Sequence, residues 1–231
     1  MHGNLRALEA VLRLFRELEV DQVVCLGDLV GYGPWPNEVV DRLITAKIPT
    51  VLGRYDERIA FEIGDLPTGS RSLGDQTLAW TRENVSPEVR KQLRDLPVRL
   101  RLTVGGARIL CVHGGLESTD DRIDLTAPAA ELQKIAERAR VRLVLSGRSH
   151  LPYRRDVADA IFICPGSVGV PINGQPGADY AIVTVADGNV EASFGKASYD
   201  LKAAAEDVVL AGLPQALAEV ILTGAAPGAR V

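Results

Sequence analysis

Short apolar runs that each end near a glycine recur along the chain and favour a layered α/β fold. Runs of this kind are typical of buried strands. Each leads to a polar residue or turn: Gln22–Leu26 to Gly27-Asp28, Arg108–Val112 to His113-Gly114, and Arg142–Leu145 to Ser146-Gly147, ahead of His150. Because such strand ends converge on one site in layered α/β folds, we expect Asp28, His113 and His150 to lie close together.

Helical spacing alternates with these runs. The apolar residues of Asn4–Leu18 recur at the interval of one buried helical face, and Ser86 followed by Pro87 is typical of a helix start. We also predict helices over 38–46, 127–140, 201–210 and 214–222, and strands over 49–52, 98–104, 160–164, 180–185 and 189–194, with turns at Gly105-Gly106 and Asp187-Gly188. A length of 231 residues, 46% of them hydrophobic, predicts one domain over residues 1–231, with a helical insertion over about residues 56–96 and C-terminal helices over about residues 200–223.

The composition gives no support for a nucleic-acid or a membrane partner. A net charge of −4 indicates no basic surface of the kind that supports nonspecific nucleic-acid binding. Cys25, Cys111 and Cys164 each lie in an apolar run, which favours buried, reduced thiols and a reducing compartment. No stretch approaches the roughly 18 apolar residues of a membrane span, and no signal pattern opens the chain. We therefore expect a cytoplasmic protein without a membrane partner.

All the histidines of the chain lie in turns that contain glycine. The three are found in His2-Gly3-Asn4, His113-Gly114-Gly115 and Gly147-Arg148-Ser149-His150. One such histidine is more often structural, but three together with Asp28 favour a metal site. Imidazole and carboxylate groups are ligands of Zn, Mn and Fe.

A series of short motifs, in order from residue 2 to about residue 200, resembles the calcineurin-like metallophosphoesterases. The motifs are His2-Gly3-Asn4, Gly27-Asp28-Leu29-Val30-Gly31-Tyr32-Gly33-Pro34, Gly53-Arg54-Tyr55-Asp56, Val112-His113-Gly114-Gly115, Gly147-Arg148-Ser149-His150 and Pro165-Gly166-Ser167-Val168-Gly169. The second and last are the most specific. The resemblance implies a four-layer α/β/β/α sandwich of two mixed sheets, with the site at one rim.

In that family an aspartate bridges two metal ions, and Asp28 takes its position here. The resemblance implies that His2, Asp28 and His150 hold one metal, together with an aspartate two residues before His2. It implies that Asp28 and His113 belong to the other metal, whose remaining ligand positions are Arg54 and Arg148. We therefore expect at most one divalent transition metal, Mn, Fe or Zn, and an empty second metal site.

The aspartate expected before His2 lies outside a sequence that begins at Met1. We interpret this as a start assigned too late or a shortened chain, and N-terminal mass spectrometry of the native protein giving Met1 as its first residue would contradict that interpretation. The alternative is a genuine start at Met1, with the loss of a central strand.

Two arginines and a tyrosine change the chemistry of the site. A guanidinium does not lose its proton to bind a metal, so Arg54 and Arg148 either grip phosphate in place of the second metal or form salt bridges to Asp28 or Asp56 in an inactive site. Tyr55 takes the position of the catalytic histidine, and its reference pKa of about 10 makes it a poorer acid. We assign Tyr55 and Asp56 to the catalytic positions.

Three functions follow from these expectations. The first is a phosphoesterase, a hydrolase with an impaired site of at most one metal. The second is a noncatalytic protein that binds phosphate or a nucleotide through Arg54 and Arg148. The third is a structural or partner-binding protein with a vestigial site. For the first two, the expected partner is a small phosphorylated molecule or nucleotide, whose identity the core motifs do not specify.

Overall fold

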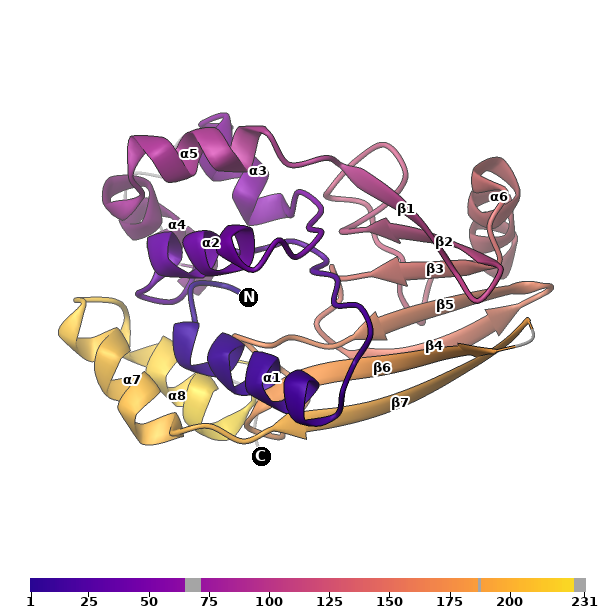
Figure 1. Cartoon of the computed structure of the whole chain (residues 1–231). Helices are drawn as coiled ribbons and strands as arrows, with labels where there is room; N and C mark the ends of the chain where they lie inside the picture. Colours follow the sequence, from indigo (N-terminus) through magenta and orange to yellow (C-terminus); the bar gives the residue numbers. More distant parts are fainter. Residues whose placement is uncertain (65–71, 187, 227–231) are drawn as a thin grey trace.

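The structure, a computed structural model, describes residues 1–64, 72–186 and 188–226 (Figure 1). The helices are α1 (Leu5–Glu17), α2 (Pro36–Thr45), α3 (Arg54–Ala60), α4 (Leu73–Asn84), α5 (Pro87–Arg94), α6 (Ala129–Ala139), α7 (Leu201–Leu210) and α8 (Gln215–Thr223). The strands are β1 (Arg99–Val104), β2 (Ala107–Val112), β3 (Leu143–Ser146), β4 (Pro152–Val157), β5 (Ala160–Pro165), β6 (Ala178–Ala186) and β7 (Asn189–Ala197).

The described strands form two sheets. The larger has the order β1-β2-β3-β5-β4, and the smaller pairs β6 with β7. In the larger sheet β2, β3 and β5 run parallel, with Cys111 opposite Leu145 and Leu145 opposite Ile163. Their carboxyl ends therefore meet at one edge of this sheet, where His113 follows β2 and Gly147 follows β3.

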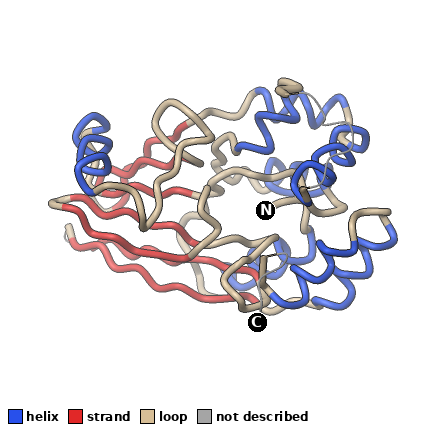
Figure 2. Tube along the Cα trace, turned by 180° about the vertical axis from the view of Figure 1, so that it is seen from behind, coloured by secondary structure: helices blue, strands red, loops and turns tan. Residues whose placement is uncertain are grey.

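Helices cover the outer faces of the two sheets, which gives the predicted α/β/β/α order of layers (Figures 1 and 2). Helix α1 packs on β6 and β7 through Ala10 and Val11. Helix α6 packs on the far face of the larger sheet through Leu132 and Ala136. Between the sheets lie the apolar side chains of Ile109, Cys111, Leu143, Ile161, Ile163 and Val190. Among the described residues the larger sheet is mixed, as predicted, and the smaller sheet pairs β6 with β7 antiparallel.

Two predicted strands are absent from the described residues. Residues 22–26 and 49–52 contain a single parallel bridge, from Cys25 to Thr50, instead of strands. The apolar side chains that suggested strands are buried in the core, and Cys25 and Val51 are 2% and 0% exposed. A ladder of hydrogen bonds on both sides, which a central strand needs, does not form at these residues.

Strand β4 was not predicted. Its centre carries Arg154, Arg155 and Asp156, which hide the apolar alternation of a half-buried strand. Arg154 instead forms an ion pair with Asp156 at 2.8 Å. Charged residues are typical of an edge strand, where they oppose pairing with other chains, and β4 lies at the edge of the larger sheet.

The predicted helical insertion contains α4 and α5. Ser86 caps α5 by accepting a hydrogen bond from Val89 N, with Pro87 at the first helical position, as predicted. Trp80 of α4 donates from Nε1 to the carbonyl of Ala211 at 2.9 Å and so packs against the C-terminal helices. The predictions that involve residues 65–71 and the turn residue Asp187 lie outside the described residues. Among the described helices, none has the length and apolar character needed to cross a bilayer.

We expect the cysteine thiols to resist alkylation in the native protein. Cys25, Cys111 and Cys164 are all buried. Burial raises the pKa of Cys25 to about 11 and that of Cys111 to about 12, and it raises the pKa of Cys164 in the same direction. Because the thiolate is the reactive form, iodoacetamide at pH 8 should label these thiols only after denaturation. Mass spectrometry of the labelled native protein checks this, and rapid labelling of any of the three would contradict it.

Candidate metal centre

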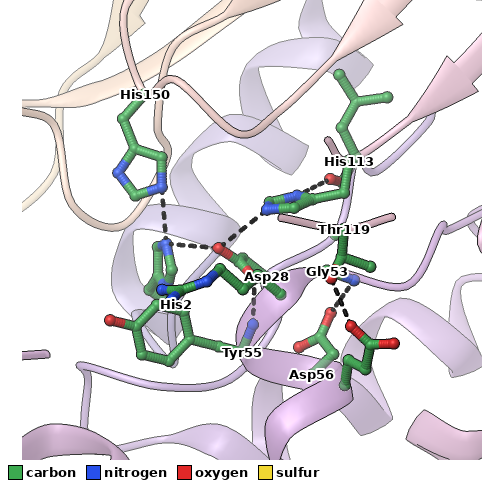
Figure 3. Close-up of polar contacts among 12 residues, drawn as sticks. His2, Asp28, Gly53, Tyr55, Asp56, His113, Thr119 and His150 are labelled. Atoms are coloured by element: carbon green, nitrogen blue, oxygen red, sulfur yellow. Dashed lines mark hydrogen bonds and ion pairs between the residues drawn. The ribbon is translucent and has the colours of Figure 1, made fainter. Parts of the chain in front are cut away.

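Asp28 is buried and stands at the centre of the candidate site (Figure 3). It follows Gly27 in a turn in which both residues have positive φ, 85° and 52°. Asp28 Oδ1 accepts a hydrogen bond from the backbone N–H of Tyr55 at 2.7 Å. This approach requires a glycine at position 53, because a Cβ there would lie 1.9 Å from Asp28 N. The Gly27-Asp28 turn and the start of α3 therefore pack in close contact.

Two histidines converge on the second oxygen of Asp28. His2 Nε2 lies 3.5 Å and His113 Nε2 lies 3.3 Å from Asp28 Oδ2. His150 joins them from the loop after β3, with its Nε2 3.0 Å from His2 Nε2. The ligand atoms of His2, Asp28 and His150 all lie within 4.8 Å of one another. The four predicted ligands, which are 148 residues apart at the extreme, thus share one site.

Backbone conformation contributes to this convergence. His2, Asp28 and His150 have φ values of 55°, 52° and 58°, in the left-handed region that non-glycine residues rarely adopt. Residues held in such conformations are concentrated at functional sites, where the surrounding structure maintains them. Here the N–H of His2 donates to Asp28 O at 2.7 Å, and the N–H groups of Gly147 and Arg148 donate to His113 O at 3.0 Å.

The hydrogen bonds of the imidazoles direct their free nitrogens toward Asp28. His113 Nδ1 donates to the carbonyl of Leu26 at 2.7 Å, and His2 Nδ1 donates to the carbonyl of Val30 at 3.3 Å. Metal-bound histidines commonly donate their second ring N–H to such a carbonyl. His113 Nε2 is buried and has no hydrogen-bond partner among the described residues. Without a proton or a cation between them, the lone pairs of these nitrogens would face a carboxylate oxygen, so the site fits a divalent metal ion.

Burial and neighbouring charges shift the pKa values of the site residues in different directions. Burial lowers the pKa of His2 far below its ordinary value and that of His150 to about 4, in spite of the nearby Asp28 carboxylate. For His113, burial alone would lower the pKa, but Asp28 outweighs it and raises the pKa. Burial alone would raise the pKa of Asp28, and His113 and His2 outweigh it and lower the pKa. His2 and His150 are therefore neutral and Asp28 is ionised at neutral pH, which is the state that metal binding needs.

Asp56 is fully buried beneath this site and holds its turns together. Asp56 Oδ1 accepts from the N–H groups of Leu29 and Val30 at 2.8 and 3.1 Å, and Oδ2 accepts from Gly53 N at 2.9 Å. Burial, with the charge of Asp28, raises the pKa of Asp56 to about 6. These contacts favour a positioning role for Asp56, whose assignment to a catalytic position stays a prediction.

Tyr55 occupies the predicted position beside His2 but directs its hydroxyl to another tyrosine. The Tyr55 hydroxyl donates to the hydroxyl of Tyr32 at 3.0 Å, and both rings contact the ring of His2 edge-on. Burial, together with Tyr32, raises the pKa of Tyr55 well above its ordinary value. Proton donation by this phenol at neutral pH is therefore unfavourable. Tyr32 was not among the predicted site residues, although an aromatic residue between Gly31 and Gly33 was a signal for it.

The two arginines have different environments. Arg54 forms an ion pair with Asp120, in the loop after β2, and not with Asp28 or Asp56, so the predicted salt bridge had the wrong partner. Arg148 is half-buried, and within the described part of the chain its Nε has no hydrogen-bond partner. Burial lowers the pKa of Arg148, as does the nearby charge of Arg54. Arg148 is thus a half-buried cation beside the metal ligand His150.

An α/β/β/α sandwich with three imidazoles around a buried carboxylate at one rim is typical of metal-dependent phosphoesterases. The chain belongs to the calcineurin-like phosphoesterase superfamily, whose domain matches residues 1–188. It is 27% identical to the uncharacterized protein MJ0912 of Methanocaldococcus jannaschii, over 97% of this chain and 95% of that protein. It is 24% identical to phosphodiesterase YfcE of Escherichia coli, over 76% of this chain and 79% of YfcE.

Solved structures show the same fold. The metallophosphoesterase of Sphaerobacter thermophilus has a TM-score of 0.75 and 28% identity, with 96% of each chain covered. The hypothetical protein PH1004 of Pyrococcus horikoshii OT3 has a TM-score of 0.80 and 26% identity, with 96% of this chain and 95% of that chain covered. The fold predicted from the motifs is therefore confirmed.

Proposed function

We propose that this protein is a phosphoesterase that binds one divalent transition metal, Mn, Fe or Zn, through His2, Asp28 and His150. The observation that carries the proposal is the convergence of two neutral imidazoles and one ionised carboxylate within 4.8 Å. Two histidines and one carboxylate are a recurrent ligand set for such metals. A metal held there supplies Lewis-acid polarisation of a phosphoryl oxygen and activation of water.

Arg148 contributes to substrate binding in this proposal. Its guanidinium replaces the charge of a second metal and binds the phosphate of a small phosphorylated molecule or nucleotide. Asp28 orients the imidazoles of His2 and His113, and Asp56 holds the turns that carry Asp28. A phosphodiester is the substrate class to test first, because the relative YfcE is named a phosphodiesterase.

A second candidate function, phosphate or nucleotide binding without hydrolysis, is favoured by Tyr55. Its buried phenol, hydrogen-bonded to Tyr32, is a weak proton donor for a leaving group. Metal analysis and turnover of bis(p-nitrophenyl) phosphate distinguish the two. One metal per chain with turnover supports the phosphoesterase. Thermal stabilisation by inorganic phosphate without turnover supports the binding protein. If neither result is obtained, both functions are contradicted, and a structural or partner-binding role remains.

We expect Arg148→Ala to weaken phosphate binding by about 10- to 100-fold, because a hydrogen bond to a charged group contributes about 1.5 to 3 kcal/mol. Arg54→Ala is the matched control, since Asp120 already neutralises the Arg54 guanidinium; its effect should be several-fold smaller. Competitive inhibition by inorganic phosphate measures both. Binding that is unchanged in the Arg54→Ala, Arg148→Ala double variant would exclude a phosphate grip by these arginines.

A further inference from the structure

Two arginines are anchored to the same pair of candidate metal ligands. Arg148 N donates to His113 O at 3.0 Å. Arg54 directly precedes Tyr55, whose N–H donates to Asp28 Oδ1 at 2.7 Å. Since His113 Nε2 lies 3.3 Å from Asp28 Oδ2, the two segments that carry the arginines meet at one place. Burial lowers the pKa of Arg148 most, and the positive charge of Arg54 lowers it further, so the two guanidiniums lie close enough to interact.

Asp120 neutralises one of these arginines. Its carboxylate forms an ion pair with Arg54 Nε, and the side chains of Asp120 and Arg54 are 64% and 30% exposed. Over the described ranges, 1–64, 72–186 and 188–226, Arg148 takes part in no ion pair, and its buried Nε has no hydrogen-bond partner. A phosphate group can therefore bind Arg148 without displacing a carboxylate, whereas at Arg54 it has to compete with Asp120.

The loop between β2 and α6 holds Asp120 in this position. Thr119 Oγ1 donates to Glu57 Oε2 of α3 at 2.5 Å, which places the loop beside the start of α3 (Figure 3). Further along the loop, Ile123 O accepts a hydrogen bond from the hydroxyl of Tyr153 in β4 at 2.6 Å. The chain is thus tied to the fold on both sides of Asp120, so the carboxylate of this residue is presented to the site by a fixed loop.

The arrangement of charges favours a ligand with a single phosphate group. A second phosphate joined to one at Arg148, as in a diphosphate, would meet an arginine that is already neutralised and the Asp120 carboxylate, whose negative charge acts on Arg148. Like charges placed side by side oppose binding and so discriminate between ligands. Arg122 of the same loop also acts on Arg148, but its side chain is exposed, so solvent and salt screen its charge.

We propose that Asp120 is a specificity-determining residue, which holds Arg54 as an internal counter-anion and so selects ligands with one phosphate group over ligands with a diphosphate group. Esters of a single phosphate are then the preferred class, and nucleoside diphosphates and other diphosphates are disfavoured. This inference rests on the proposed function, because it takes phosphate binding at Arg148 as its starting point. It adds the class of ligand and assigns the selection to a residue outside the metal ligands.

The test compares inorganic phosphate with inorganic pyrophosphate. Isothermal titration calorimetry measures both dissociation constants with the full chain, in buffer without added divalent metal, because pyrophosphate chelates such ions. Asp120→Asn should tighten pyrophosphate binding by at least about tenfold, since Arg54 becomes free to bind the second phosphate. Phosphate binding should tighten by at most about threefold, because only a screened charge is removed. Asparagine keeps the N–H that donates to Ser118 Oγ at 3.1 Å, so the loop should stay in place.

Two further variants make this result specific. Glu117→Gln is the matched control, because Glu117 lies in the same loop, is 65% exposed and pairs with Arg138 instead of Arg54. It removes the same charge and should leave the ratio of the two dissociation constants unchanged. Arg54→Ala combined with Asp120→Asn should abolish the gain in pyrophosphate affinity, because the arginine that Asp120 releases is then missing.

Three results would overturn the proposal. They are an unchanged ratio of dissociation constants in Asp120→Asn, an equal change in Glu117→Gln, and a gain that persists without Arg54. If the ratio is unchanged while phosphate binding still depends on Arg148, the selection by Asp120 is excluded and the proposed phosphate-binding role stands. If neither ion binds the unaltered protein or any variant, both the selection by Asp120 and the phosphate-binding role of Arg148 are excluded.

Discussion

Asp28→Asn is expected to remove tight divalent-metal binding while the protein remains folded. Asp28 Oδ2 is the atom toward which the nitrogens of His2 and His113 point, and it supplies the only negative charge of the proposed ligand set. Loss of a group that merely supports a metal ligand costs about 10- to 100-fold in affinity. Loss of the ligand charge itself should therefore weaken Mn²⁺ binding by more than about 100-fold, measured by isothermal titration calorimetry.

The fold should tolerate this change because the amide oxygen of asparagine can still accept the hydrogen bond from Tyr55 N. A matched control is Asp156→Asn, which alters an exposed carboxylate paired with Arg154 and distant from the ligand set. Its Mn²⁺ affinity should equal that of the unaltered protein. Equal Mn²⁺ affinities for the Asp28→Asn variant and the control would refute a metal site centred on Asp28. If the protein hydrolyses bis(p-nitrophenyl) phosphate, the turnover of the Asp28→Asn variant should fall together with its Mn²⁺ affinity.

Asp56→Ala is expected to destabilise the protein by about 3 to 9 kcal/mol. The substitution removes the acceptors of three buried N–H groups, those of Leu29, Val30 and Gly53. Each unsatisfied buried donor costs about 1 to 3 kcal/mol. In a chain of this size a loss of that order lowers the melting temperature by at least about 6 °C. Urea denaturation of the metal-free protein measures the free energy of unfolding directly.

Two further variants make the result specific. Asp56→Asn keeps one oxygen that accepts from the N–H groups of Leu29 and Val30, but it places an amide donor against Gly53 N. Its stability should therefore lie between that of the unaltered protein and that of the Asp56→Ala variant. Asp156→Ala removes an exposed carboxylate whose ion pair contributes at most about 1 kcal/mol. A loss for Asp56→Ala as small as that for Asp156→Ala would show that Asp56 does not hold these turns.

Much of the fold and of the ligand set could be predicted from the sequence because the signals are local. Helix α1 follows from its apolar spacing and from Asn4, which accepts a hydrogen bond from Ala7 N. The hairpin of β1 and β2 follows from apolar runs on either side of Gly105-Gly106. The ligands could be predicted as a group because parallel strands bring their ends, and the residues that follow them, to one edge of a sheet.

Only the tertiary structure decided which groups pair across the site. The sequence by itself placed Arg54, Tyr55 and Arg148 in motifs whose resemblance to the family predicts ligand and catalytic positions. It did not show that Asp120 pairs with Arg54, or that Tyr32 binds the hydroxyl of Tyr55. These partners come from other turns, and their distances depend on packing, which no local pattern encodes. Residues 22–26 have the composition of a strand but do not form one in the described structure. Composition could not predict this, because strand pairing also requires a neighbouring strand within hydrogen-bonding distance.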